Sequence, residues 1–206
     1  MEAPSTLSNH YFTRRPTSKK KEGIIKGRLR GHNWEFYTSS GVFSRKKIDN
    51  GTRLLIESMI LPEEGVILDL GCGYGPIGIV AARINSKLEV LMTDINERAT
   101  KLASRNVKRN KVGNVQVLQG NLYEPVKAKK FKAILTNPPI SAGIHKVVTP
   151  IIEGSIEYLE SGGSLQLVVQ SNKGGKTLSK LMQNTYSNIK VISRGSGFRV
   201  LRSIKQ

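Results

Sequence analysis

The sequence has few of the residues that build metal centres and disulfide frameworks. Among its 206 residues there is one cysteine, Cys72, and the three histidines are far apart, at His10, His32 and His145. A single cysteine excludes an intramolecular disulfide framework, and scattered histidines offer no ligand cluster for zinc. We therefore expect neither a disulfide-stapled fold nor a bound metal ion.

Long apolar runs and acidic residues are also scarce. No apolar stretch approaches the roughly 20 residues that a membrane helix needs, and the basic N-terminus lacks the apolar core of a secretory signal. We therefore expect a soluble, cytoplasmic protein without a membrane partner. Asp and Glu number 15 against 33 Lys and Arg, which gives a formal net charge of +18. An excess of this size indicates a polyanionic partner rather than a particular fold.

The chain is predicted to consist of a basic N-terminal segment, residues 1–21, and one domain, residues 22–206. The segment mixes Ser, Thr, Pro and Asn with five or more cations, a composition that buries too little apolar surface to become ordered. We expect its beginning to be mobile. Ile24–Arg30 and His32–Thr38 alternate around Gly31, which predicts a β-hairpin ahead of the main fold.

Strands and helices alternate through the rest of the domain. The predicted strands are Val66–Leu70, Leu88–Thr93, Val115–Leu118, Ala133–Thr136, Ser164–Gln170, Ile189–Ser193 and Phe198–Ile204. The predicted helices are Ile77–Ile84, Asn96–Asn110, Val147–Leu159 and Thr177–Gln183. Strands separated by helices imply a parallel sheet covered on both faces, and the last two strands, with no helix between them, should be antiparallel. The fold class is therefore α/β.

A glycine-rich loop, residues 71–75, follows the first strand of this sheet, and Pro76 suits the start of the next helix. Glycines there allow positive φ angles and let a ligand touch the backbone. The spacing Gly73-x-Gly75-x-x-Gly78 matches a dinucleotide fingerprint. Asp69, however, places a carboxylate where it would repel the pyrophosphate of NAD and attract a cationic amino-acid ligand. The loop thus favours S-adenosyl-L-methionine over NAD, with a ligand-free tight turn as the alternative.

The segment Asn137-Pro138-Pro139-Ile140 follows the fourth strand, at the edge where open α/β sheets bind ligands. An exocyclic base amine is a poor nucleophile because its lone pair is delocalised into the ring, so acceptors that hold its NH₂ group assist attack. The side-chain oxygen of Asn137 and the carbonyl of Pro138 can supply two, since each proline biases the preceding residue toward an extended backbone. Methyl transfer would then depend on alignment and electrostatics rather than on a general base. A turn capped by two prolines is the alternative.

These motifs resemble the class I S-adenosylmethionine-dependent methyltransferases, specifically the ribosomal RNA small-subunit guanine-N2 methyltransferase group. The resemblance spans residues 10–205 and includes four further segments: Asp94, Asn121-Leu122-Tyr123, Gly41-Val42-Phe43-Ser44 and Asp49-x-Gly51-Thr52. The chain is similar to the catalytic copy of the duplicated bacterial form, as in archaeal single-domain relatives. The resemblance implies a Rossmann-like, seven-stranded, mostly parallel sheet with an antiparallel last strand and an N-terminal hairpin extension.

The resemblance also implies roles for individual residues. The catalytic segment is Asn137, Pro138, Pro139 and Ile140. The cofactor-binding residues are Asp69, Gly71, Cys72, Gly73, Asp94, Ile95, Asn121, Leu122 and Asn137. Among them Asp94 takes the ribose hydroxyls, Asn121 lies beside adenine, and the Cys72 thiol is left for packing. Many amine methyltransferases have Tyr or Phe at the position of Ile140, so base stacking is assigned to Phe43, with packing against the cofactor and core packing as the alternatives.

Clusters of cations favour RNA as the substrate. Residues 14–30 carry eight Lys or Arg against Glu22 alone, and residues 171–206 carry eight with no acidic residue. Such clusters neutralise phosphates. The candidate RNA-binding residues are Arg14, Arg15, Lys19, Lys20 and Lys21. The cations of the helix at residues 96–110 are instead expected to cover a solvated outer face.

Other interpretations remain open. A protein glutamine or other amine N-methyltransferase could use the same Asn-Pro-Pro acceptors, although a net charge of +18 would then be unexplained. A catalytically silent RNA-binding module could keep the fold, although intact Asp69, Asp94 and Asn137 argue against it. Transfer RNA is an alternative to ribosomal RNA as the substrate.

Overall fold

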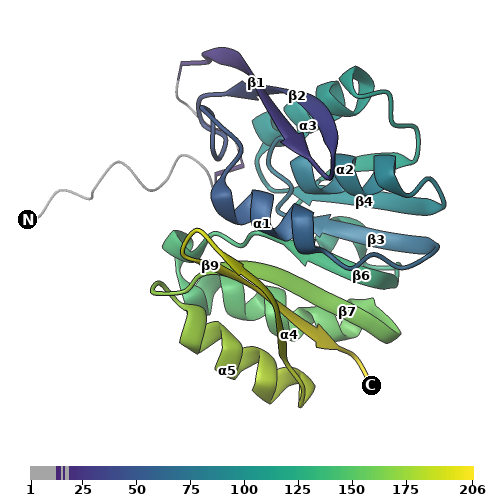
Figure 1. The fold of residues 1–206 in the computed structure, drawn as a ribbon, viewed down its shortest axis with the longest axis vertical. Helices are drawn as coiled ribbons and strands as arrows, with labels where there is room; N and C mark the ends of the chain where they lie inside the picture. Colours follow the sequence, from purple (N-terminus) through teal and green to yellow (C-terminus); the bar gives the residue numbers. More distant parts are fainter. Residues whose placement is uncertain (1–12, 15, 17–18) are drawn as a thin grey trace, which may run out of the picture.

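A computed structural model describes residues 13, 14, 16 and 19–206 of the chain. The expected mobility of the first residues and the candidate Arg15 lie outside this part. A two-stranded antiparallel hairpin, β1 (Glu22–Leu29) and β2 (His32–Ser39), precedes the main sheet, as the sequence predicts. Figure 1 shows the hairpin packed beside a helix of the main domain.

The main sheet contains seven strands among the described residues. They are β3 (Gly65–Leu70), β4 (Leu88–Asp94), β5 (Val115–Gln119), β6 (Phe131–Thr136), β7 (Leu159–Gln170), β8 (Lys190–Gly195) and β9 (Phe198–Ile204). The helices are α1 (Asn50–Ser58), α2 (Pro76–Ile84), α3 (Glu97–Arg109), α4 (Thr149–Tyr158) and α5 (Gly175–Tyr186). Two short 3-10 helices, Glu124–Val126 and Ile140–Ala142, and a π-helical turn, Ile144–Val148, complete the fold.

The strand order is β5-β4-β3-β6-β7-β9-β8. Strands β5, β4, β3, β6 and β7 pair in parallel, whereas β9 is antiparallel to both β7 and β8. The parallel strands need crossover connections, which the helices provide. This confirms the predicted α/β fold, and it brings the carboxyl ends of β3, β4 and β6 to one edge of the sheet.

Apolar side chains of the central strands alternate between the two faces of the sheet. Ile67 packs in a core with α1, α2, α3 and the hairpin, while the next residue, Leu68, packs in a second core with α4 and α5. Figure 1 shows these two groups of elements on opposite sides of the sheet. No helix in the described part of the chain is long and apolar enough to cross a membrane.

The structure corrects one expectation about helix α3. The guanidinium carbons of Arg105 and Arg109 lie 4.4 Å and 4.8 Å from the centre of the Tyr37 ring in β2. Arg105 also pairs with Glu22 at 2.7 Å, and Arg109 pairs with Glu35. These cations therefore join the hairpin to α3 rather than forming a purely solvated face.

Candidate active site

The register of the sheet brings three of the expected site residues together. Asp69 of β3 lies opposite Met92 of β4 and opposite Leu135 of β6. Two residues further along the three chain segments come Gly71, Asp94 and Asn137. Because parallel strands keep their register, these residues stand at one level of the carboxyl edge, where open α/β sheets bind their ligands.

The glycine loop is anchored at one end and open on its outer side. The backbone N–H groups of Gly71 and Cys72 donate to the carbonyl of Thr93 at 2.8 Å and 2.9 Å. Gly71 and Gly73 have φ angles of 74° and 58°, in the left-handed region that favours glycine. A Cβ atom built on either would meet no atom within 4 Å. The loop backbone therefore forms an open cradle that a ligand can approach closely.

Asp94 is tied to this loop by its carboxylate. Its Oδ2 accepts from the Gly73 N–H at 2.8 Å, and its Oδ1 accepts from the Asn96 N–H at 2.8 Å. A carboxylate has about four acceptor positions, so about two remain for ligand hydroxyl groups. Burial raises the pKa of Asp94 to about 6, against the hydrogen bonds from the backbone, which lower it.

Asp69 lies beneath the loop and is fully buried. Its Oδ2 accepts from the Gly78 N–H in the first turn of α2 at 2.8 Å, whereas its Oδ1 has no hydrogen-bond partner among the described residues. Burial raises the pKa of Asp69 to about 7, and the neighbouring Asp94 raises it further. Two carboxyl groups in one sparsely solvated edge create a negative field that suits a cationic ligand.

The side-chain amide of Asn137 is held from one side. Its Nδ2 donates to Asp49 Oδ2 at 3.1 Å and to Thr52 Oγ1 at 2.9 Å. An ionised carboxylate accepts but never donates, so the NH₂ group must face Asp49. Nothing among the described residues donates to Asn137 Oδ1, and that oxygen remains an acceptor at the sheet edge.

Asp49 and Thr52 contact the candidate residue Asn137, a link that the sequence did not reveal. Asp49 is the N-cap of α1 and also accepts from the Thr52 N–H at 2.9 Å. Both residues belong to the segments that carry the resemblance, but no local pattern places them near Asn137. An Asp is a preferred N-cap residue, and this signal could have indicated α1.

The rest of the Asn-Pro-Pro segment forms a compact turn. The carbonyl of Pro138 accepts from the Ile140 N–H at 2.9 Å, and the carbonyl of Pro139 accepts from the Ala142 N–H at 3.0 Å. A carbonyl oxygen has two lone pairs, so Pro138 keeps one for a ligand. Ile140 is partly buried and begins the 3-10 helix, so its side chain contributes packing to this turn.

Phe43 extends from the segment that joins the hairpin to α1. Its neighbour Val42 is buried, but 48% of the Phe43 surface is exposed. The carbonyl of Gly41 accepts from Asn96 Nδ2 at 2.8 Å, next to Asp94. The exposed ring therefore lies in the segment that adjoins the cofactor loop, and the core-packing alternative for Phe43 loses its support.

The remaining cofactor candidates lie around the same edge. Asn121 is exposed and follows Gln119, the residue paired with Asp94, by two positions. Leu122 turns the chain there with a φ of 48°, and the carbonyl of Ile95 accepts from Gln119 Nε2 at 3.3 Å. Cys72 is buried, and burial raises the pKa of its thiol well above the usual range. Its sulfur is thus suited to packing rather than to nucleophilic attack.

The basic N-terminal tract approaches the same region through its backbone. The carbonyl of Arg14 accepts from the Glu97 N–H at 3.1 Å, at the start of α3. Lys19 and Lys21 are exposed, and their backbone groups bond Ser40 Oγ at 2.6 Å and 3.0 Å. The Lys20 ammonium pairs with Glu22 at 2.7 Å. The tract is therefore attached to the fold, and its cations are not equally available.

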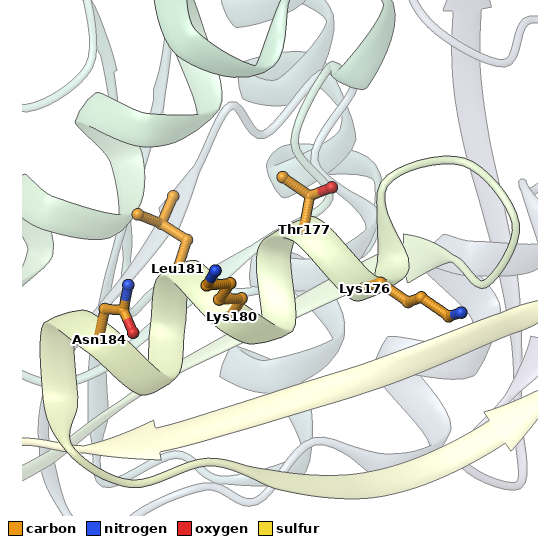
Figure 2. Close-up of a pocket in the computed structure, with 5 residues that line it drawn as sticks. All are labelled: Lys176, Thr177, Lys180, Leu181 and Asn184. Carbon is orange, nitrogen blue, oxygen red and sulfur yellow. The ribbon is translucent and has the colours of Figure 1, made fainter.

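A surface hollow elsewhere does not coincide with this edge. It is lined by side chains that all come from α5, as Figure 2 shows: Lys176, Thr177, Lys180, Leu181 and Asn184. None of these residues belongs to the glycine loop or to the Asn-Pro-Pro segment. The candidate active site is therefore an open edge of the sheet rather than this hollow.

The strand order with an antiparallel β9, the open glycine loop and the Asn-Pro-Pro turn at one sheet edge define a class I methyltransferase. A family model described as the methyltransferase small domain matches residues 33–202. The chain belongs to this family. The family and the fold support the expected cofactor, S-adenosyl-L-methionine, and the open cradle beside the free acceptor positions of Asp94 fits it.

The proteins similar to this chain differ in how much of their own length the match covers. The uncharacterized protein YbxB of Bacillus subtilis is 39% identical over 97% of this chain and 100% of its own length. The ribosomal RNA small subunit methyltransferase C of Hamiltonella defensa is 30% identical over 81% of this chain, which spans only 49% of that protein. The 16S rRNA N2 G1207 methyltransferase of Thermus thermophilus, solved with AdoMet and guanosine, superposes with a TM-score of 0.81 at 24% identity. That match covers 93% of this chain and 52% of the other.

Proposed function

We propose that the protein transfers a methyl group from S-adenosyl-L-methionine to the exocyclic N2 amine of a guanine in RNA, with small-subunit ribosomal RNA as the preferred substrate. The observation that carries the proposal is the orientation of Asn137. Its NH₂ group is held by Asp49 and Thr52, so its Oδ1 is an acceptor at the edge where Gly71 and Asp94 also stand. An acceptor there is what an amine substrate requires.

Two acceptors can hold the amine. Asn137 Oδ1 and the second lone pair of the Pro138 carbonyl can each accept one N–H, which directs the nitrogen lone pair toward the methyl donor. The bound cofactor supplies an electrophilic methyl group on its sulfonium sulfur. The chain's contribution is to align the amine and to place fixed dipoles where charge develops.

The negative edge beneath the loop assists binding of the cofactor. Asp94 offers its remaining acceptor positions to ribose hydroxyls, and the Gly71 and Gly73 backbone leaves room for the amino-acid end. Asp69 is fully buried beneath the loop, and its ionised form would attract the cationic amino-acid end of the cofactor. Asn121, with an amide oxygen that can accept from an amino group, is assigned to the adenine end.

Three properties favour RNA over a protein substrate. The formal net charge of +18 matches a phosphate polymer. Two of the relatives named above are, by their printed names, ribosomal RNA methyltransferases, and one of these was solved with guanosine. The exposed ring of Phe43 offers a face for stacking a base that has left its pairing.

The test is to identify the methylated product. The protein is incubated with methyl-labelled cofactor and, separately, with small-subunit ribosomal RNA, assembled small subunits, transfer RNA and total cell protein. Each sample is then digested and analysed by mass spectrometry. We expect N2-methylguanosine from ribosomal RNA, and no product from the Asn137→Ala variant. Label in protein glutamine, or in another nucleoside, would overturn the proposal.

A further inference from the structure

We propose that the rim of the active site is a binding surface for single-stranded RNA. Two clusters of cations line this rim. The loop bank is Arg45, Lys46 and Lys47, and the hairpin bank is Arg194 and Arg199 of the β8–β9 pair with Lys173 of the neighbouring loop. The Phe43 ring is the stacking platform. This inference rests on the proposed function and adds the path of the substrate strand. It also assigns phosphate contacts to residues outside the N-terminal tract.

The loop bank is a rigid strip of exposed cations. All three side chains are exposed, and no carboxylate lies within ion-pair distance of them in the described part of the chain. The carbonyls of Arg45 and Lys47 accept from Thr38 Oγ1 at 3.0 Å and from Ser44 Oγ at 2.5 Å, which fixes the loop backbone. Lys47 is two residues before Asp49, so its Cα lies within about 8 Å of the residue that holds Asn137.

The hairpin bank lies on the other face of the same sheet edge. The β8–β9 turn packs on the start of α1 through Phe198, because a Cβ atom on Gly51 would lie 2.9 Å from that ring. Successive residues of a strand point to opposite faces, so Arg199 and its cross-strand partner Arg194 lie on the α5 face. A Cβ atom on Gly174, the residue after Lys173, would lie 3.6 Å from Ile140 of the Asn-Pro-Pro turn. Lys173 lies in the loop that leads from β7 into α5, where Arg199 Nε donates to Ser171 Oγ at 3.3 Å.

The pairing of Arg194 with Arg199 is unfavourable unless an anion is present. Like charges directly opposite each other on neighbouring strands are destabilising. Residues 171–206 contain no acidic residue, and no carboxylate of the described chain forms an ion pair with either guanidinium. A phosphate between the two side chains would replace this repulsion with attraction. The positive surface continues onto α5, from which Lys176 and Lys180 project (Figure 2).

Several cations elsewhere in the molecule form ion pairs. On and beside the N-terminal β1–β2 hairpin and on α3, the following are paired with Glu22, Glu35 or Glu97: Lys20, Lys26, Lys101, Arg105 and Arg109. Other exposed cations, such as Lys108 and Lys127, also have no ion pair in the described part of the chain. The two banks are distinguished by their place, next to the segment that holds Asn137 and next to the Asn-Pro-Pro turn.

The exposed ring of Phe43 decides between a single strand and a duplex. An aromatic ring stacks on the face of an unpaired base, whereas the bases of a duplex already stack on each other. Phe43 belongs to the same segment as the loop bank, two residues before Arg45. A base on the ring and phosphates on the adjacent cations match the spacing of one flexible strand.

The test measures binding of a fluorescein-labelled 20-nucleotide single-stranded RNA of mixed sequence, by anisotropy, over a range of KCl concentrations. The loop-bank variant is Arg45→Gln, Lys46→Gln, Lys47→Gln. Its matched control is Lys87→Gln, Lys111→Gln, Lys127→Gln, which removes the same charge from exposed side chains without an ion pair in the described part of the chain, before β4, β5 and β6 at the opposite edge of the sheet. If the three cations each contact one phosphate, the slope of log affinity against log salt should fall by about 2 in the loop-bank variant. The control should keep the parent slope.

Phe43→Ala supplies an independent measurement. It should weaken single-strand binding about tenfold with an unchanged salt slope, since stacking releases no counterions. Binding of a 20-base-pair RNA duplex should hardly respond to this change. The surface is refuted if the control triple weakens binding as much as the loop-bank triple, because affinity would then follow net charge alone.

The failure of this inference can be told apart from failure of the proposed function. If the parent protein methylates RNA and the loop-bank variant binds that RNA with the parent slope, the surface is wrong and the activity stands. If the banks bind RNA as expected but no nucleoside is methylated, the proposed function is wrong and the surface stands. Unfolding temperature, measured for every variant, should match the parent because all the substituted side chains are exposed.

Discussion

The NH₂ group of Asn137 donates to two residues at the start of α1, which leaves its Oδ1 as an acceptor at the sheet edge. The residues that impose this orientation are 85 and 88 positions away in the sequence. A carboxylate is a strict acceptor, so Asp49 excludes the flipped amide without touching the substrate. Asp49 is in this sense a positioning residue for the acceptor.

Asn137→Ala should leave cofactor affinity nearly intact and lower methyl transfer by at least about a hundredfold, the scale observed when one preorganised hydrogen-bonding group is removed from a transition state. The fold should survive because the residue follows the end of β6. Single-turnover methylation of RNA and calorimetry of cofactor binding measure the two effects. Transfer at the parent rate would remove Asn137 from the mechanism.

Asp49→Asn tests the orientation separately. Asn still caps a helix, so α1 should remain formed, but its own amide can present either group to Asn137. We expect transfer to slow by about tenfold, the equivalent of one charge-assisted hydrogen bond. Thr52→Ser keeps a hydroxyl group and should stay near the parent rate. Combined with Asn137→Ala, the Asp49 change should add nothing, and an additive loss would mean that Asp49 acts elsewhere.

Cofactor affinity should depend on pH through Asp94. Burial raises its pKa to about 6, so the carboxyl group of the free protein becomes protonated as the pH falls below that value. Ribose hydroxyls donate to the ionised form, hence affinity should fall between about pH 7 and pH 5 through Asp94. Asp69, whose pKa burial raises to about 7, should add a shallower fall that begins near pH 8. Calorimetry across this range measures the change. Asp94→Asn should bind weakly with a flatter profile in that window, and an unchanged profile would assign the titration to another group.

At the scale of elements, the hairpin and the cofactor loop are joined through one residue of α3. Asn106 is fully buried. Its Oδ1 accepts from the Tyr37 N–H at 2.7 Å, and its Nδ2 donates to the carbonyls of Tyr37 and Tyr74 at 3.0 Å and 2.8 Å. Tyr74 belongs to the glycine loop, and its ring lies 5.7 Å from that of Phe36 in β2. The hairpin thus supports the loop from outside the sheet.

Asn106→Ala should therefore destabilise the fold and loosen the loop together. It leaves one buried N–H and two buried carbonyls without their partner, and each such group costs about 1–3 kcal/mol. We expect a loss of about 3 kcal/mol or more in the free energy of unfolding by urea, with weaker cofactor binding. Lys108→Ala, on the exposed side of the same helix, should change stability by less than about 0.5 kcal/mol. Equal stability of the two variants would contradict the role of Asn106.

The sequence predicted most elements because their patterns are local. The two hairpin strands, the seven strands of the sheet and four of the five long helices follow from apolar periodicity and glycine turns. Helix α1 was not predicted, because it has nine residues and two of the four that it buries, Gly51 and Thr52, are not large apolar residues. Strand β7 begins earlier than expected because Leu159 pairs with Phe131, a contact that no local pattern contains.

The features of the site also divide into those that local patterns predict and those that depend on distant segments. Asp94 and Asn137 were found from their places after strands, and the structure puts both at one sheet edge. The orientation of Asn137, the link through Asn106 and the pairing of Arg105 with Tyr37 depend on segments far apart in the chain. Such contacts become visible when the topology is known.

At the scale of the whole molecule, the cations that give the formal net charge of +18 should contribute unequally to RNA binding. Changing Arg14, Arg15, Lys19, Lys20 and Lys21 together to Gln should weaken RNA binding and flatten its salt dependence. Because Lys20 is already paired with Glu22, we expect a smaller slope change per charge than in the loop-bank variant. Anisotropy titrations compare the two. A parent-like slope would leave the tract as a solubilising extension.

The position of β9 between β7 and β8 has a consequence for the order in which the chain can fold during synthesis. Strand β8 precedes β9 in the chain but pairs with the sheet only through β9. Residues 190–195 therefore cannot join the sheet until residues 198–204 have been synthesised. Until then β7 presents an unpaired edge with the stretch Leu165–Val169, apolar except for Gln166, which is a template for pairing with other chains. A chain truncated before Phe198 should accordingly bind chaperones or aggregate rather than accumulate as a smaller soluble domain.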